Sequence, residues 1–71
     1  AYYLRAHAYK LSRQYQQAIV DFNSVIKLEP NHVDAYVNRG LLYMLTGERP
    51  KAEKDWKKAS RLNPKYAELF P

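Results

Sequence analysis

The 71-residue chain has no cysteine, which excludes disulfide bonds and thiolate metal sites. Its two histidines, His7 and His32, are 25 residues apart in the sequence and have no second pair to complete a site. We therefore expect no metal and no cofactor. A chain this short buries only about 60% of its unfolded surface. Without covalent staples, we expect its support to come from stacking of its elements.

The sequence also contains no run of about 18 apolar residues and no basic stretch followed by a short apolar core, so no segment of it predicts a transmembrane helix or a signal peptide. It has no glycine-rich phosphate loop, no activated nucleophile and no pair of carboxylates placed as in a pocket, so catalysis has no support. We expect a soluble protein that is not an enzyme. We favour an intracellular location, although many secreted domains also lack disulfides, so the compartment stays open.

What the sequence does have is a repeat with a period of 34 residues. The matched pairs are Ala1 and Ala35, Tyr2 and Tyr36, Arg5 and Arg39, Tyr9 and Tyr43, Ala18 and Ala52, Asp21 and Asp55, Leu28 and Leu62, and Pro30 and Pro64. A period of this length indicates that each unit is one supersecondary element that must stack on a neighbour to bury its apolar face. Because Ala1 falls inside the repeat pattern, we expect the chain to be a fragment of a longer array.

Apolar residues at helical spacing, separated by breaking residues, predict four helices. They cover about 1–12, 15–28, 32–45 and 50–62. Tyr2, Ala6, Tyr9 and Leu11 form the expected inward stripe of the first helix. Asn31 is the predicted N-cap of the third helix, and Gly47 is its predicted stop, because glycine adopts the left-handed conformation cheaply. Pro50 suits the first turn of the fourth helix, where its missing N–H costs little.

The domain organisation follows from this pattern: a single unit with a first repeat over about 1–32, a second over about 33–66, and a cap or the beginning of a third repeat at 67–71. In a third repeat, Pro71 would lie a full turn inside a helix, at a cost of about 3 kcal/mol. We therefore favour a short C-terminal capping helix that lays Leu69 and Phe70 over the last apolar face.

The residues at the repeated positions resemble the signature of the tetratricopeptide repeat. In the second unit these residues are Tyr36, Gly40, Tyr43, Ala52, Trp56, Ala59 and Pro64. The first unit has Tyr2, Ala6, Tyr9, Ala18, Phe22, Val25 and Pro30 in the same places. The resemblance covers nearly the whole chain and implies an all-α, right-handed solenoid of two helical hairpins. Gly40 opposite Ala52 is expected to bring the helices of a hairpin close together, with Phe22 and Trp56 between the units.

Arginine stands at two positions where the family often has leucine. Arg5 and Arg39 are separated by one period, and Asp21 and Asp55 recur at the same offset from them. We therefore predict that each arginine pairs with an aspartate, either across its own hairpin or with its neighbour.

The resemblance implies that the first helix of each hairpin lines a concave groove that holds a peptide or helix of a protein partner. The candidate groove residues are Tyr3, Leu4, His7, Lys10, Asp34, Val37, Asn38 and Leu41. Among these, the amide of Asn38 is suited to hydrogen bonds with a peptide backbone. The alternative is that Tyr3, Val37 and Leu41 are covered by adjacent repeats, and that the chain is a segment for structural stacking or self-association.

Some members of the family hold the C-terminal carboxylates of heat-shock chaperones in a clamp of lysine, asparagine and arginine side chains. Of the clamp positions that fall within this chain, only Asn38 has a matching residue. Tyr3, His7 and Glu68 occupy the others. We therefore do not expect a chaperone clamp here.

The fourth predicted helix is strongly basic. Its outer face is predicted to contain Lys51, Lys54, Lys58 and Arg61. A solvated face is the simpler interpretation, because Glu53 and Asp55 have the spacing to pair with Lys57 and Lys51. Nucleic-acid binding is a less favoured function, supported by the net charge of +5 and by candidate exposed rings at Tyr3, Tyr15 and Tyr66. No membrane partner is expected.

Overall fold

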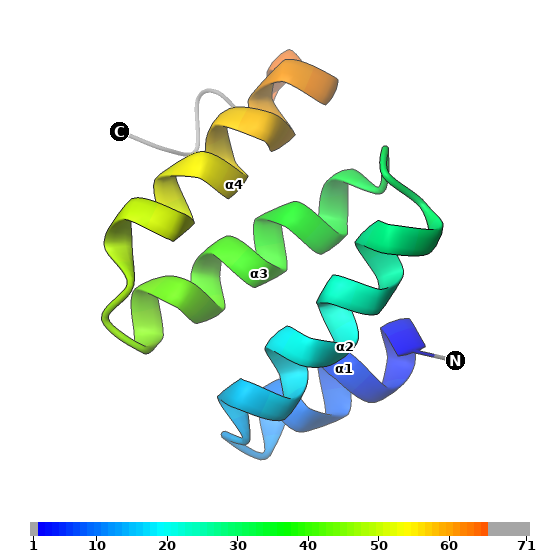
Figure 1. Cartoon of the computed structure of the whole chain (residues 1–71), viewed down its shortest axis with the longest axis vertical. Coiled ribbons are helices and arrows are strands. Elements are labelled where there is room, and N and C mark those ends of the chain that lie inside the picture. The colour runs from blue at the N-terminus through cyan, green and yellow to red at the C-terminus, as the bar shows by residue number, and fades with distance from the viewer. Residues whose placement is uncertain (1, 66–71) are drawn as a thin grey trace.

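A computed structural model describes residues 2–65 of the chain, which contain four helices and no strand (Figure 1). The helices are α1 (Tyr2–Leu11), α2 (Tyr15–Leu28), α3 (Val33–Leu45) and α4 (Arg49–Leu62). They confirm the predicted all-α fold of two helical hairpins. The expected C-terminal cap at 67–71 lies outside the described residues. Within residues 2–65, every helix is too short or too polar to cross a membrane.

The four helices pack in chain order. α1 packs against α2, α3 packs against α4, and the two hairpins meet where α2 packs against α3 (Figure 1). α2 is therefore buried from both sides, whereas α1 and α4 form the two ends of the stack. This order agrees with repeats that bury their apolar faces against a neighbour.

The two ends of α3 differ in how well the sequence predicts their capping residues. The N-cap is His32, not the predicted Asn31: the Nδ1 atom of His32 accepts a hydrogen bond of 3.1 Å from the backbone N–H of Ala35. That donor belongs to the third residue of the helix, which a cap side chain commonly reaches. Asn31 lies one residue too early for this contact. At the other end, Gly47 has a φ of +83°, which confirms the predicted stop.

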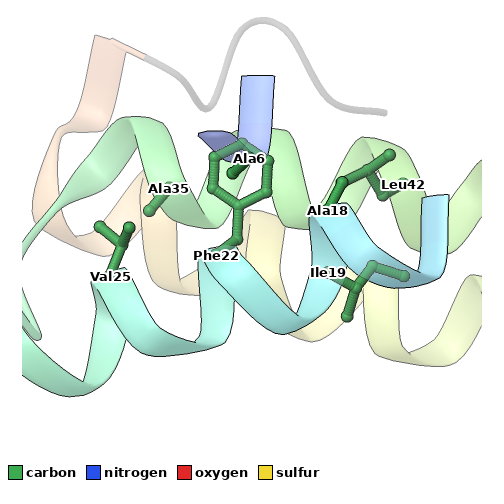
Figure 2. Close-up of a cluster of buried hydrophobic side chains, with 7 residues drawn as sticks. All are labelled: Ala6, Ala18, Ile19, Phe22, Val25, Ala35 and Leu42. Carbon is green, nitrogen blue, oxygen red and sulfur yellow. The ribbon is translucent and has the colours of Figure 1, made fainter. Parts of the chain in front are cut away.

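One cluster of the core consists of small and aliphatic side chains around one aromatic ring. It comprises Ala6, Ala18, Ile19, Phe22, Val25, Ala35 and Leu42, shown together in Figure 2. Phe22 and Leu42 are the largest side chains that are completely buried. The expectation for Leu11 was wrong, because its side chain is among the most exposed apolar groups of the described chain. It is the last residue of α1, where the helix ends before the chain turns toward α2.

The two helices of the second hairpin meet at Gly40. A methyl group added there would lie 2.5 Å from Nε1 of Trp56 and 3.3 Å from Cβ of Asp55. The atoms of α4 nearest to Gly40 therefore belong to Trp56 and Asp55. In the first hairpin the positions of Gly40 and Trp56 are occupied by Ala6 and Phe22. In the first hairpin, therefore, the residue on the first helix is larger than Gly40 and the ring on the second helix is smaller than that of Trp56.

Candidate protein-interaction surface

The first helices of the two hairpins, α1 and α3, share one face that a hydrogen bond bridges. Nζ of Lys10 donates to Oδ1 of Asn38 over 2.7 Å, although the two residues are 28 positions apart. Nδ2 of Asn38 donates to the backbone carbonyl of Asp34 over 2.8 Å. The structure therefore brings together three of the predicted groove residues. It also shows that the amide oxygen of Asn38 and one of its two N–H groups are already engaged.

Exposed and half-buried aliphatic side chains lie on the same two helices as this polar bridge. Leu4 on α1 and Leu41 on α3 are exposed, and Val37 is half-buried. Met44 and Leu45 are exposed too, and they stand three and four residues after Leu41, so they extend its stretch of helix surface. We call the surface formed by Leu4, Lys10, Val37, Asn38 and Leu41 the α1/α3 face. Helical spacing from Leu41 places Met44 and Leu45 beside the α1/α3 face.

Tyr3 and His7 are half-buried in a cluster of rings. The Tyr3 ring lies 4.6 Å from that of His7 and 4.8 Å from that of His32, and the His7 ring packs edge-on against Phe22 at 5.5 Å. Edge-to-face packing of this kind is a favourable arrangement for aromatic rings. The prediction that Tyr3 has an exposed ring was therefore wrong. These two groove candidates present only part of their surface to a ligand.

The environment of this cluster keeps both side chains uncharged at neutral pH. Burial raises the pKa of the Tyr3 phenol, and the nearby carboxylate of Asp34 raises it further. Burial lowers the pKa of the His7 imidazole below its ordinary value of 6.5, the ammonium of Lys10 lowers it further, and Asp34 opposes the shift. Tyr3 and His7 therefore supply ring surface and neutral polar atoms rather than charge.

The described part of the chain contains no set of side chains placed as metal ligands. Within residues 2–65, no group of three or more histidine, cysteine, aspartate or glutamate side chains is placed to hold a metal ion. The two histidines do approach the same Tyr3 ring, but His32 uses Nδ1 to cap α3.

Each hairpin is locked by a two-pronged arginine–aspartate pair, as the repeat predicted. Nε and Nη2 of Arg5 lie 2.7 and 2.8 Å from the carboxylate oxygens of Asp21. Nε and Nη2 of Arg39 lie 2.8 and 2.5 Å from those of Asp55. Both aspartates are buried, and the hydrogen bond from Arg5 lowers the pKa of the Asp21 carboxyl. These pairs fix how the helices of a hairpin are set against each other.

The basic outer face of α4 has an exposed Lys51, Lys54 and Arg61 and a half-buried Lys58. The predicted ion pairs were wrong. Glu53 pairs with Arg49 at 3.3 Å, and Asp55 turns inward to Arg39. Lys51 instead pairs with Glu48 at 2.9 Å.

Tyr15 was also expected to be exposed, but it packs against the core. The described tyrosines Tyr3 and Tyr15 are therefore not the open stacking platforms that single-stranded nucleic acid uses. The third candidate ring, Tyr66, lies outside the described residues.

Three known proteins have sequences similar to this chain. The chain is 26% identical over 70 residues to anaphase-promoting complex subunit 3 of Schizosaccharomyces pombe, covering 99% of this chain and 10% of that protein. It is 33% identical over 58 residues to Hsp70-Hsp90 organizing protein 3 of Arabidopsis thaliana, covering 82% of this chain and 10% of the relative. It is 38% identical over 56 residues to tetratricopeptide repeat protein 6 of Homo sapiens, covering 75% of this chain and 11% of that protein. The chain thus spans about a tenth of the length of these relatives.

A solved structure and the sequence pattern of a family also match this chain. The crystal structure of MamA superimposes with a TM-score of 0.87 at 32% identity, covering 89% of this chain and 37% of that chain. The sequence pattern of the tetratricopeptide repeat matches residues 1–32 and again residues 33–66. Two matches that together span most of the chain, on two stacked helical hairpins, show that this chain belongs to the tetratricopeptide repeat family.

Proposed function

We propose that the chain is a protein-interaction scaffold whose α1/α3 face binds a peptide or helix of a partner protein. The family it belongs to supports this role, as do relatives that are named as a subunit of the anaphase-promoting complex and as an organizing protein for two chaperones. The observation that carries the proposal is the bridge from Lys10 to Asn38, with exposed Leu41 three residues after Asn38 on α3. Aliphatic side chains beside fixed hydrogen-bonding groups on rigid helices suit an extended or helical peptide.

The chemistry of this face favours an apolar peptide over an acidic one. Tyr3 and His7 are neutral, and the ammonium of Lys10 is already held by Asn38. A peptide carboxylate would therefore find one cation, in contrast to the set of cations in a chaperone clamp. Leu4 and Leu41 offer anchoring contacts for aliphatic or aromatic side chains, and the remaining N–H of Asn38 offers a bond to a backbone carbonyl.

A peptide-display selection on the folded chain tests this proposal. The dissociation constants of the selected peptides are then measured by fluorescence anisotropy against the natural chain and against Leu41→Ala. Loss of an anchoring leucine contact is expected to weaken binding about tenfold. Leu28→Ala is the matched control, because Leu28 is an exposed leucine on α2, away from the α1/α3 face.

Circular dichroism verifies that each variant keeps its helicity. The proposal fails if Leu41→Ala and Asn38→Ala bind the selected peptides as tightly as the natural chain does. It also fails if Leu28→Ala weakens binding as much as Leu41→Ala.

A further inference from the structure

Three basic side chains beyond the first turn of α4 have no acidic partner. The acidic residues of the helix are held elsewhere, Glu53 by an arginine of the first turn and Asp55 by an arginine of α3. The carboxylate of the N-cap is likewise paired with a lysine of the first turn. No acidic side chain within residues 2–65 pairs with the cations that follow on the outer side of α4, which are Lys54, Lys58 and Arg61. We call these three side chains the α4 basic stripe.

The stripe is straight and offers charge without apolar surface. Its residues follow one another at steps of four and three, which keeps them on one side of the helix over an axial length of about 10 Å. Lys54 and Arg61 are exposed, and Lys58 is half-buried. None of the exposed large apolar side chains within residues 2–65 belongs to α4. A ligand of this stripe is therefore recognised through its charge.

Neighbouring hairpins do not cover this side of α4. Lys54 and Arg61 are exposed although the preceding hairpin is in place and packs through α3. The effect of a following hairpin is seen on α2, against which α3 packs (Figure 1). The residues of α2 one period before the stripe are half-buried or exposed, with Val20 61% exposed; they are Val20, Ser24 and Lys27. Stacking on either side therefore leaves these positions open.

The charge of the stripe is a property of α4 rather than of the repeat. Of the three matching residues of α2, Lys27 alone is a cation. The helix dipole favours Arg61 in the last turn of α4, but it gives no advantage to Lys54 in the middle of the helix. Lys54 and Lys58 are four residues apart, and like charges at this spacing destabilise a helix. A bound anion would offset that repulsion.

We propose that the α4 basic stripe docks an acidic helix of a partner protein. Carboxylates at positions i, i+4 and i+7 of such a helix have the axial spacing of Lys54, Lys58 and Arg61, because both helices rise equally per residue. The surface is separate from the α1/α3 face, and the inference does not depend on what that face binds.

Two other polyanions fit the stripe less well. Single-stranded nucleic acid binds through aromatic rings on which its bases stack, and no exposed ring within residues 2–65 belongs to α4. A helix that lies on a membrane inserts apolar side chains, and the described α4 exposes no large one. Charge complementarity without stacking or insertion favours the carboxylates of a protein.

The test uses a fluorescein-labelled, alanine-rich helical peptide with glutamates at i, i+4 and i+7 as its probe. Fluorescence anisotropy measures the dissociation constants of the natural chain and of the double variant Lys54→Gln, Arg61→Gln. The matched control is the double variant Arg13→Gln, Lys27→Gln, which removes the same charge from the turn before α2 and from the last turn of α2. A control peptide of the same composition has its glutamates scattered around the helix. Circular dichroism verifies that each variant keeps its helicity.

We expect Lys54→Gln, Arg61→Gln to bind the probe about tenfold more weakly than the natural chain, because two ion pairs are lost. The control variant is expected to bind within about twofold of the natural chain. Raising the salt concentration is expected to weaken binding, because exposed charges are screened. The proposal is overturned if the natural chain does not bind the probe, if both variants lose the same affinity, or if the scattered peptide binds equally well.

Competition experiments distinguish the other polyanions. A single-stranded oligonucleotide and a vesicle containing phosphatidylserine each compete with the labelled peptide for the natural chain. We expect the unlabelled acidic peptide to displace the probe at a lower concentration of negative charge than either competitor does. More effective displacement by the oligonucleotide or the vesicle would overturn the acidic helix as the occupant of the stripe.

Discussion

Replacing Gly40 with alanine tests the close approach of α3 and α4. The added methyl group would lie 2.5 Å from Nε1 and 2.7 Å from Cδ1 of Trp56, whereas ordinary contacts begin at 3.4 Å. The indole would therefore have to withdraw by roughly 0.9 Å. It belongs to the packed interior of the hairpin, so this movement disturbs its other contacts. Overpacking of this kind costs about 1–3 kcal/mol.

Two opposing effects set the expected magnitude. Exchanging glycine for alanine inside a helix is worth about 1 kcal/mol in favour of folding. Because the overpacking cost equals or exceeds this gain, Gly40→Ala is expected to lower the free energy of unfolding by about 1 kcal/mol. The first hairpin contains the compensated combination, with Ala6 where Gly40 stands and Phe22 where Trp56 stands. Adding Trp56→Phe to Gly40→Ala is therefore expected to relieve the clash, with a coupling of about 1 kcal/mol.

Urea unfolding followed by far-ultraviolet circular dichroism measures these effects, provided that the dependence on denaturant is unchanged among the variants. Ala6→Gly is the control, because no large ring is compressed at that position and the change is expected only to destabilise the chain. The reasoning is refuted if Gly40→Ala stabilises the protein by the full helix-propensity gain. It is equally refuted if the effects of Gly40→Ala and Trp56→Phe simply add.

Three further substitutions probe local contacts. Asp55→Ala is expected to lower the free energy of unfolding by about 3 kcal/mol, because it leaves the partly buried guanidinium of Arg39 without its carboxylate partner. Asp21→Ala is expected to cost less, because Arg5 is more exposed to water. Equal losses of the free energy of unfolding for the two variants in urea would contradict this reasoning. The pKa of His7 in the folded chain lies below its ordinary value of 6.5. As the pH drops below 6.5, the unfolded chain therefore binds the proton before the folded chain does. The stability that His7 contributes is complete above pH 6.5 and falls as the pH drops toward the folded-state pKa. His7→Gln is expected to flatten this part of the thermal unfolding profile, and an unchanged slope would disprove the assignment. His32→Ala is expected to cost about 1 kcal/mol through loss of the N-cap, whereas His32→Asn retains most of the stability; equal unfolding midpoints for the two variants would argue against capping.

Much of the fold could be predicted because its signals are local or periodic. Gly47 marks the end of α3 through a conformation that glycine adopts cheaply, and Pro50 falls in the first turn of α4 where its missing donor does no harm. The pairing of Arg39 with Asp55 followed from a repeated offset rather than from any knowledge of the structure. The N-cap of α3 was missed because asparagine is the better general cap, and only the backbone geometry at His32 decides between neighbouring residues.

The site was harder to predict, because helical spacing places a residue on a face without saying what covers that face. Tyr3 and Leu4 are neighbours on α1 and were both groove candidates. Tyr3 packs beside Phe22 of the next helix, whereas Leu4 is exposed. Likewise, the bond between Lys10 and Asn38 joins residues that share a face but belong to different hairpins. Contacts of this kind depend on how the hairpins stack, and the spacing of residues within one helix does not determine that stacking.

The most direct test of the account is a nuclear magnetic resonance titration of the chain with a peptide selected for binding. Binding at the α1/α3 face predicts that the largest amide chemical-shift changes fall at Lys10, Val37, Asn38 and Leu41, with little change along the outer face of α4. Changes concentrated on the basic residues of α4, or at Arg5 beside Asp21, would contradict the central claim that the α1/α3 face is the partner-binding surface.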